Sequence, residues 1–173
     1  MVTPSIQKLC WGRYDYKIDE KGRLLLPYEF RDVLGERLVL VAGPYNEIRL
    51  YSDQSFGSFQ DELAGSSLMD EYDEEFLYIQ RLFGNCERVS RDTNYRATLP
   101  DRLREYAGLL TNTSAIIIGC GNRVEIWSEA NLAKQSNKID MEKIKNVARS
   151  RRGLLPALSA EVASTVANEA SVA

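Results

Sequence analysis

The order of apolar and polar positions along the chain predicts short strands and one short helix. Apolar or β-branched positions at 13–18 and 24–26 predict two strands, and 27–34 has the spacing of a helix face. Two further runs, at 38–41 and 48–51, predict another pair of strands. The N-terminal part of the chain is therefore predicted to follow the order β-β-α-β-β.

The same order returns in a second copy, and a polar turn motif returns with it. Residues 19–27 (DEKGRLLLP) and 92–100 (DTNYRATLP) keep the spacing from Asp to Arg to Pro, and strands are predicted again at 115–118 and 124–127. Further matched pairs are Arg31 with Arg104, Gly35 with Gly108, Asn46 with Asn122 and Ser52 with Ser128. Because each copy is too short to bury a core alone, we predict that two halves pair around a pseudo-two-fold axis.

Helices are predicted outside the two copies. Ser52 and Ser128 have the residue type of helix N-caps, the apolar spacing at 70–83 is helical, and a basic helix is expected over 138–152. The expected division is a first half at 1–53, an acidic helical connector at 54–84, a second half at 85–130, a basic C-terminal helix at 131–153 and a disordered tail at 154–173.

Composition excludes several classes of protein. The chain has 173 residues, of which 44% are hydrophobic, as is ordinary for a globular protein. No apolar run approaches the roughly 20 residues that span a bilayer, and residues 1–13 lack the apolar core of a signal peptide. We therefore expect a cytoplasmic protein that does not span a membrane.

The residue types that catalysis and metal binding use most often are scarce. The sequence has no histidine, and Cys10, Cys86 and Cys120 lie far apart without a Cys-x-x-Cys spacing. Buried, reduced thiols are the expected state of these cysteines. No Gly-rich phosphate loop or nucleophile elbow stands out. We expect no catalytic residue, no metal site, no cofactor and no small-molecule substrate.

Charge is distributed unevenly along the chain. The formal net charge is −3, but residues 50–80 hold eight acidic residues and no Lys or Arg. The remainder holds 22 basic and 17 acidic residues, with local basic excesses at 88–104 and 134–152. An overall acidic chain therefore contains basic segments that suit a polyanion. The acidic segment itself is interpreted as a solvated helical face, and the alternatives are that it mimics nucleic acid or binds a basic partner.

Two interpretations of the turn motif remain open. Asp19 and Asp92 fit a structural role, in which the carboxylate caps backbone N–H groups and pairs with the arginine four residues later. Lys21 and Arg23, at or beside the tip of a two-stranded ribbon joined at Gly22, fit contact with DNA instead. Such a ribbon has the width of a major groove, and arginine can grip guanine or phosphate.

Three separated segments resemble the MraZ family of bacterial DNA-binding proteins. They are residues 16–27, 102–109 and 121–127, and the resemblance extends over about residues 11–145. It implies a duplicated AbrB-like double swapped-hairpin β-barrel, mainly β with short helices (α+β), that assembles as a homo-oligomeric ring. It also implies binding to repeated boxes of double-stranded DNA in the promoter of its own division and cell-wall gene cluster, and hence association with the nucleoid.

The resemblance assigns the candidate DNA-binding residues. Carried over by position, Lys21 and Arg23 face DNA in the first half and Arg96 faces it in the second. From their hairpin positions, Lys21, Lys17 and Arg91 are expected to contact phosphates and Arg23 to read bases.

The second motif departs from the family pattern. Asn94 and Tyr95 stand where the first motif has Lys21 and Gly22. This exchange removes a positive charge, and a tyrosine in the place of Gly22 would be strained, which leaves a shifted turn register open.

The expected function is therefore a sequence-specific transcriptional regulator that gains affinity from several subunits binding at once. The alternative is a protein-interaction scaffold of the same fold that uses the acidic connector or the basic C-terminal helix and does not read DNA. An enzyme is not expected.

Overall fold

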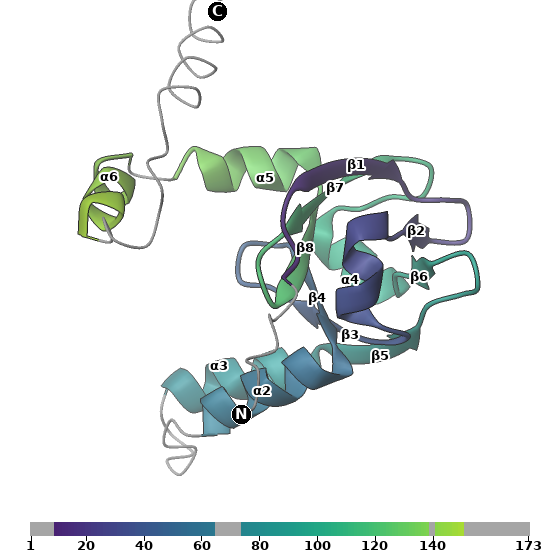
Figure 1. Ribbon diagram of the computed structural model, residues 1–173, viewed down its shortest axis with the longest axis horizontal. Helices are drawn as coiled ribbons and strands as arrows, with labels where there is room; N and C mark the ends of the chain where they lie inside the picture. The colour runs from purple at the N-terminus through teal and green to yellow at the C-terminus, as the bar shows by residue number, and fades with distance from the viewer. Residues whose placement is uncertain (1–8, 65–73, 139–140, 151–173) are drawn as a thin grey trace, which may run out of the picture. The chain divides into compact units, whose positions relative to one another are not determined.

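The computed structural model describes residues 9–64, 74–138 and 141–150. Six antiparallel strands form one curved sheet, and a separate pair of strands closes it into a barrel (Figure 1). The order in the large sheet is β1 (Arg13–Lys17), β7 (Ser114–Gly119), β8 (Arg123–Trp127), β4 (Ile48–Ser52), β3 (Arg37–Ala42) and β5 (Cys86–Ser90). The small sheet pairs β2 (Arg23–Leu25) with β6 (Arg96–Thr98).

The two halves exchange strands with each other. The first strand of each half pairs with the third strand of the other half, as β1 pairs with β7 and β5 pairs with β3. β2 pairs with its own counterpart β6, so that Leu24 lies opposite Ala97. If each strand of the large sheet is replaced by its counterpart in the other half, the same strand order results, read from the opposite edge. A pseudo-two-fold axis requires this. The predicted duplicated double swapped-hairpin barrel is confirmed.

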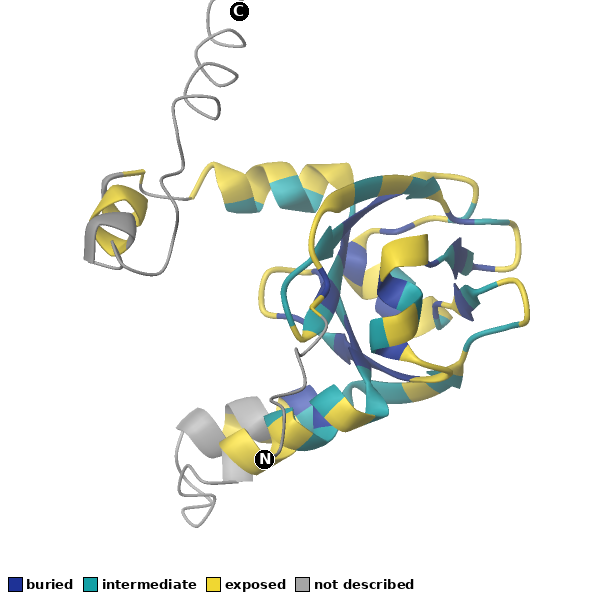
Figure 2. Cartoon of the chain, in the orientation of Figure 1, coloured by how far each residue is buried: buried dark blue, intermediate teal, exposed yellow. Residues whose placement is uncertain are grey.

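A single apolar core takes side chains from both halves. Leu24 and Leu26 of the first half and Ala97 and Leu99 of the second are at most 1% exposed, and all belong to the same cluster as Phe30. Figure 2 shows buried residues along the strands of the barrel. Neither half could bury these side chains alone, which explains why the fold needs two copies.

A short helix follows each turn and ends at a glycine. η1 (Tyr28–Phe30) continues into α1 (Arg31–Leu34), and α4 (Asp101–Ala107) has the equivalent place in the second half. Gly35 has φ +70° and Gly108 has φ +64°, in the region that favours glycine. The two predicted helices are confirmed, although the first begins as a 3₁₀ turn.

Two helices between the halves cover the outer face of β3 and β4. α2 (Asp53–Ala64) and α3 (Glu74–Gly84) pack Phe56 and Leu82 against Val39, Val41 and Tyr51. These helices lie beneath the barrel in the orientation of Figure 1. Their apolar contacts with β3 and β4 attach the acidic connector firmly to the first half.

Serine side chains cap the helices that follow each half. The Ser52 hydroxyl accepts the backbone N–H of Ser55 at 3.1 Å, and the Ser128 hydroxyl accepts that of Asn131 at 3.4 Å. Both predicted N-caps are confirmed. The amide of Asn131 also donates to the carbonyl oxygen of Ala107 at 2.9 Å, which ties the first turn of α5 (Glu129–Ser136) to the barrel.

The chain beyond residue 135 forms a second unit, which contains α6 (Met141–Ser150). This helix lies within the predicted basic helix, whereas residues 151–152 and the tail at 154–173 lie outside the described residues. The five-part division of the chain stays a prediction. Across the described ranges, no helix is long and apolar enough to cross a membrane.

Candidate nucleic-acid interface

The first turn, residues 19–23, is closed by the carboxylate of Asp19. Its Oδ1 accepts the backbone N–H groups of Lys21 and Arg23, both at 2.9 Å. The backbone N–H of Gly22 donates to the carbonyl oxygen of Asp19 at 3.0 Å, and Gly22 has φ +71°. The hydrogen bond from the Arg23 backbone is the largest of the causes that lower the pKa of Asp19 below its usual value. The predicted capping role of this aspartate is confirmed.

The second turn, residues 92–96, has the same hydrogen bonds. Asp92 Oδ1 accepts the backbone N–H groups of Asn94 and Arg96, both at 2.9 Å. The backbone N–H of Tyr95 donates to the carbonyl oxygen of Asp92 at 3.0 Å, and Tyr95 has φ +58°. The register is therefore not shifted. Tyr95 occupies the place of Gly22 with the same backbone conformation.

Two arginines contact the ring of Tyr95 and stabilise the residue in its unfavourable backbone conformation. The guanidinium carbons of Arg31 and Arg91 lie 4.1 Å and 4.2 Å from the ring centroid. Each cation–π contact contributes about 0.5–2 kcal/mol. A left-handed backbone costs a non-glycine residue about 1–2 kcal/mol. The two contacts are therefore large enough to offset the strain.

Four side chains from the two turns form one ion-pair cluster, which we call the Asp/Arg cluster: Asp19, Arg23, Asp92 and Arg96. Within each turn, Arg23 Nε lies 2.7 Å from Asp19 Oδ2 and Arg96 Nε lies 3.5 Å from Asp92 Oδ2. Across the turns, Arg96 Nη1 lies 3.5 Å from Asp19 Oδ2 and Arg23 Nη1 lies 4.0 Å from Asp92 Oδ2. Each arginine thus faces both aspartates.

The cluster depends on the pairing of β2 with β6. Backbone hydrogen bonds join the turns themselves, from Leu26 N–H to Tyr95 O and from Leu99 N–H to Gly22 O, both at 2.9 Å. Both turns project on the same side of the barrel (Figure 1). The strand exchange therefore turns two separate motifs into one composite surface.

The prediction of a two-stranded ribbon behind each tip is wrong in its extent. β1 and β2 meet in one isolated bridge, between Ile18 and Leu24, and each strand then pairs with a strand of the other half. The turns are held by their aspartates and by the Asp/Arg cluster, because a long ladder between the flanking strands is absent from the described residues.

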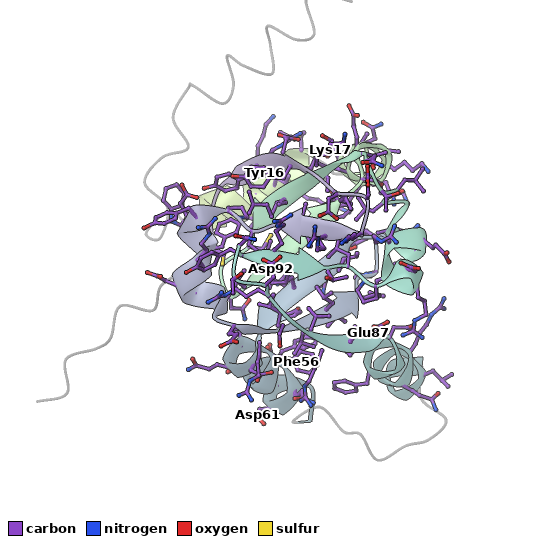
Figure 3. The ribbon with its side chains drawn as sticks, turned by 90° about the vertical axis from the view of Figure 1, so that its right-hand side faces the viewer. Tyr16, Lys17, Phe56, Asp61, Glu87 and Asp92 are labelled. Carbon is purple, nitrogen blue, oxygen red and sulfur yellow. The ribbon has the colours of Figure 1, made fainter. Side chains whose placement is uncertain are left out.

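The predicted basic residues lie around this composite surface. Lys17 and Lys21 are exposed and line a shallow depression of about 360 Å³ together with Asp19, Glu20, Arg23 and Asn112. Arg23 and Arg96 are about a third exposed, at 30% and 32%. Figure 3 looks onto this side and shows Lys17 above Asp92. Arg91 directly precedes the second turn, and its Nε donates to the carbonyl oxygen of Gly35 at 3.0 Å.

A pair of arginines beneath the turns was missed as part of the site. A Cβ at Gly22 would come within 2.9 Å of Arg104 Nε, and the matched residue Arg31 contacts Tyr95. The signal was available, because Arg31 and Arg104 correspond in the two copies. Their role was not foreseen because neither belongs to the turn motif.

The cysteines are not placed for reactive chemistry. Burial raises the pKa of Cys10, Cys86 and Cys120 to about 11, so the thiols stay protonated at neutral pH. All three are free, but only Cys10 is fully buried, and the prediction of burial is wrong for the other two, which are half-buried.

The strand exchange, the duplicated Asp-x-x-x-Arg turns and the closing β2–β6 pair define the class of the protein: a duplicated AbrB-like swapped-hairpin barrel.

The chain belongs to the MraZ family. The family model described as "MraZ protein, putative antitoxin-like" matches residues 9–79 and 82–152, one copy for each half.

Similar curated proteins carry the name transcriptional regulator MraZ. One from Caldicellulosiruptor bescii is 39% identical over 126 residues, which cover 72% of this chain and 84% of the relative. One from Leifsonia xyli subsp. xyli is 36% identical over 128 residues, covering 72% and 87%. One from Alkaliphilus oremlandii is 33% identical over 126 residues, covering 73% and 85%. The similarity thus spans most of each protein.

Proposed function

We propose that this chain is a sequence-specific DNA-binding transcriptional regulator that contacts DNA through the composite surface of its two turns. The observation that carries the proposal is the Asp/Arg cluster, which brings Arg23 and Arg96 together on one side of the barrel. The naming of its relatives as transcriptional regulators supports the same function.

The ion pairs orient the arginines for contact with DNA. A guanidinium group has five N–H donors, and the cluster engages those on Nε and Nη1 of Arg23 and Arg96. Among the residues that the structure describes, no protein acceptor takes the Nη2 donors, which leaves them for a DNA acceptor. Both side chains keep about a third of their surface exposed, at 30% and 32%. Side chains held by partners lose less freedom on binding, which favours base readout by Arg23 and Arg96.

The lysines and Arg91 supply the contacts with phosphates in this proposal. Lys17 and Lys21 are exposed beside the first turn. Contacts of this kind add affinity without sequence preference and weaken as salt rises, because bound counterions are released.

The finer parts of the proposal concern the target and the assembly. We propose that the DNA consists of repeated boxes in the chain's own promoter, upstream of a division and cell-wall gene cluster, and that a ring of subunits binds several boxes at once. The family resemblance supports this target. Linked weak contacts would raise the overall affinity without any new contact.

Fluorescence anisotropy with the DNA directly upstream of the chain's own gene tests the proposal. The wild type should bind this duplex more tightly than a scrambled duplex at two salt concentrations. Arg23→Ala should lose the preference. Arg23→Lys keeps the charge but loses the planar fork, so it should keep salt-dependent binding and lose most of the preference.

The matched control is Arg102→Ala. Arg102 is an exposed arginine whose contacts are with Glu87 and Gly84, outside both turns. This variant should discriminate the two duplexes as the wild type does. A preference retained by Arg23→Ala at wild-type stability would overturn base readout by Arg23.

One observation favours the alternative of a protein-interaction scaffold. Both motif arginines already pair with carboxylates of the same chain, as a purely structural motif requires. A scaffold should elute early from a heparin column, and its affinity for DNA should change little with salt concentration. A DNA-binding regulator should elute late, and its affinity for DNA should fall steeply as the salt concentration rises.

A further inference from the structure

The second turn contains an exchange of two residues that act together. At the positions of Ile18 and Gly22 in the first half, the second half has Arg91 and Tyr95. Ile18 is fully buried in the core, whereas Arg91 is half-buried and its guanidinium group lies 4.2 Å from the centre of the Tyr95 ring. The large ring at a strained position and the arginine against it therefore form one unit.

This exchange moves positive charge without changing its total. In the first hairpin, Lys17, Lys21 and Arg23 against Asp19 and Glu20 leave one positive charge over residues 17–23. In the second, Arg91 and Arg96 against Asp92 also leave one over residues 90–96. The cation that the second tip lacks at Asn94 is thus replaced by one at the base of the turn.

Arg31 and Arg91, which contact Tyr95, form no ion pair within the described residues, whereas Arg104, the counterpart of Arg31, does. Arg104, the counterpart of Arg31 in the second half, lies against Gly22 of the first turn, forms an ion pair with Asp101 and donates its Nε to the carbonyl oxygen of Leu99. Within the described part of the chain, neither Arg31 nor Arg91 pairs with a carboxylate, and Arg31 Nε is buried without a hydrogen-bond partner. Two uncompensated guanidinium groups on one ring create a local positive potential that favours an anion.

Arg91 retains donors for such an anion. Its Nε donates to the carbonyl oxygen of Gly35 at 3.0 Å, and its Nη1 donates to that of Asp92 at 3.4 Å. Across the described ranges, no protein acceptor takes its other three N–H donors. The stack on Tyr95 holds the plane of the group, and the edge of a guanidinium plane matches phosphate geometry.

We infer that Tyr95 is a positioning residue that holds Arg91 for a phosphate of the DNA backbone, so that the second hairpin contacts DNA at the position where the first hairpin has the buried Ile18. This inference rests on the proposed DNA-binding function. It names a contact that the turn motif does not contain.

The test compares the salt dependence of DNA binding for Tyr95→Gly, Tyr95→Phe and Arg91→Ala. Tyr95→Gly restores the residue of the first turn, so the backbone conformation is retained while the stack is lost. In Tyr95→Gly, the slope of log K against log salt should become shallower by about 0.9 for each engaged subunit. Arg91→Ala should make the slope shallower by the same amount. The double variant Tyr95→Gly/Arg91→Ala should make the slope no shallower than either single variant does. Tyr95→Phe keeps the ring and should match the wild type.

A spectroscopic readout separates positioning from general loss of structure. The Arg91 side-chain N–H resonance should show a ring-current shift in the wild type and in Tyr95→Phe, and should lose it in Tyr95→Gly. Thermal unfolding of each variant checks the fold, and Arg102→Ala is the charge control. A wild-type slope in Tyr95→Gly or in Arg91→Ala would overturn the inference. So would a slope in Tyr95→Phe as low as that in Tyr95→Gly.

The two proposals fail in distinguishable ways. A wild type that binds promoter and scrambled DNA equally contradicts the proposed sequence-specific function. The phosphate contact of Arg91 does not depend on sequence, so the same slopes measured on the scrambled duplex still decide the role of Tyr95.

Discussion

The two turns have the same backbone hydrogen bonds but different residues at the position with positive φ. Gly22 has φ +71° in the first turn, and Tyr95 has φ +58° in the second. In both, an aspartate carboxylate accepts two backbone N–H groups at 2.9 Å. Glycine is therefore not what specifies the turn. The aspartate and the pairing between the halves do so, and the residue at this position is free to acquire another role.

The turns also differ where their strands enter the core. Leu24 follows the arginine of the first turn, and Ala97 follows that of the second, opposite Leu24 in the β2–β6 pair. Both are fully buried. The first hairpin therefore supplies more apolar surface to the core, so the two copies should contribute unequally to stability.

The largest expected effect on stability comes from replacing Leu24 with alanine, the residue that the second hairpin has at the matching position, Ala97. Leu24→Ala should lower the free energy of unfolding by about 2–5 kcal/mol, because it leaves a cavity where both halves meet. Denaturant unfolding measures this change. The matched control is Leu25→Ala on the same strand, where the side chain is half-buried and should cost less. Equal losses in the two variants would contradict the assignment of the effect to the buried position of Leu24.

A smaller effect is expected from a side chain at Gly22. Gly22→Ala should lower the free energy of unfolding by about 1–2 kcal/mol from backbone strain, with a further loss because its Cβ would lie 2.9 Å from Arg104 Nε. Gly35→Ala is the control, since Gly35 has φ +70° and open space around the site of its Cβ. Gly22→Ala should therefore be the less stable of the two in thermal unfolding. The reverse order would show that Arg104 does not restrict the first turn.

The exposed tip of the first hairpin should matter for DNA and little for stability. Lys21→Ala should reduce the slope of log K against log salt by about 0.9 for each engaged subunit, because one phosphate contact is lost. Asn94→Ala, at the matching position, carries no charge to lose and should leave the slope unchanged. Equal slopes for Lys21→Ala and the wild type would remove the first tip from the interface.

The smallest expected effect is a dependence on acid pH. The pKa of Asp19 is lowered in the fold, so its contribution to stability is present above the ordinary Asp pKa of about 3.9 and is lost as pH falls through the folded value. Thermal unfolding between pH 7 and pH 3 should show this loss in the wild type and less of it in Asp19→Asn. Asp15→Asn, an exposed change on β1, should behave as the wild type. A loss in Asp19→Asn as large as in the wild type would exclude Asp19 as the source.

The repeated pattern was sufficient to predict the two-fold organisation of the fold, whereas the swapped-hairpin barrel was implied by the family resemblance. The matched spacing of 19–27 and 92–100 predicted two halves around a pseudo-two-fold axis, and the strand order has that symmetry. Local signals also placed the capping serines. These features follow from residue types and short spacings, which a single sequence displays directly.

The partners of the strands and of Tyr95 were not predictable from local pattern. A hairpin motif alone favours pairing of β1 with β2, but both strands pair with the other half. The strain at Tyr95 suggested a shifted register because the stabilising contacts come from Arg31, which is 64 positions away, and from Arg91. Contacts between residues distant in sequence decide both outcomes.

Promoter binding by Arg23→Ala, Arg96→Ala and the double variant tests the central claim most directly. If the Asp/Arg cluster is one DNA-reading unit, each single variant should lose the preference for promoter over scrambled DNA, and the double variant should add little. Wild-type preference in both single variants, at wild-type stability, would contradict the account and leave the cluster a purely structural link between the halves.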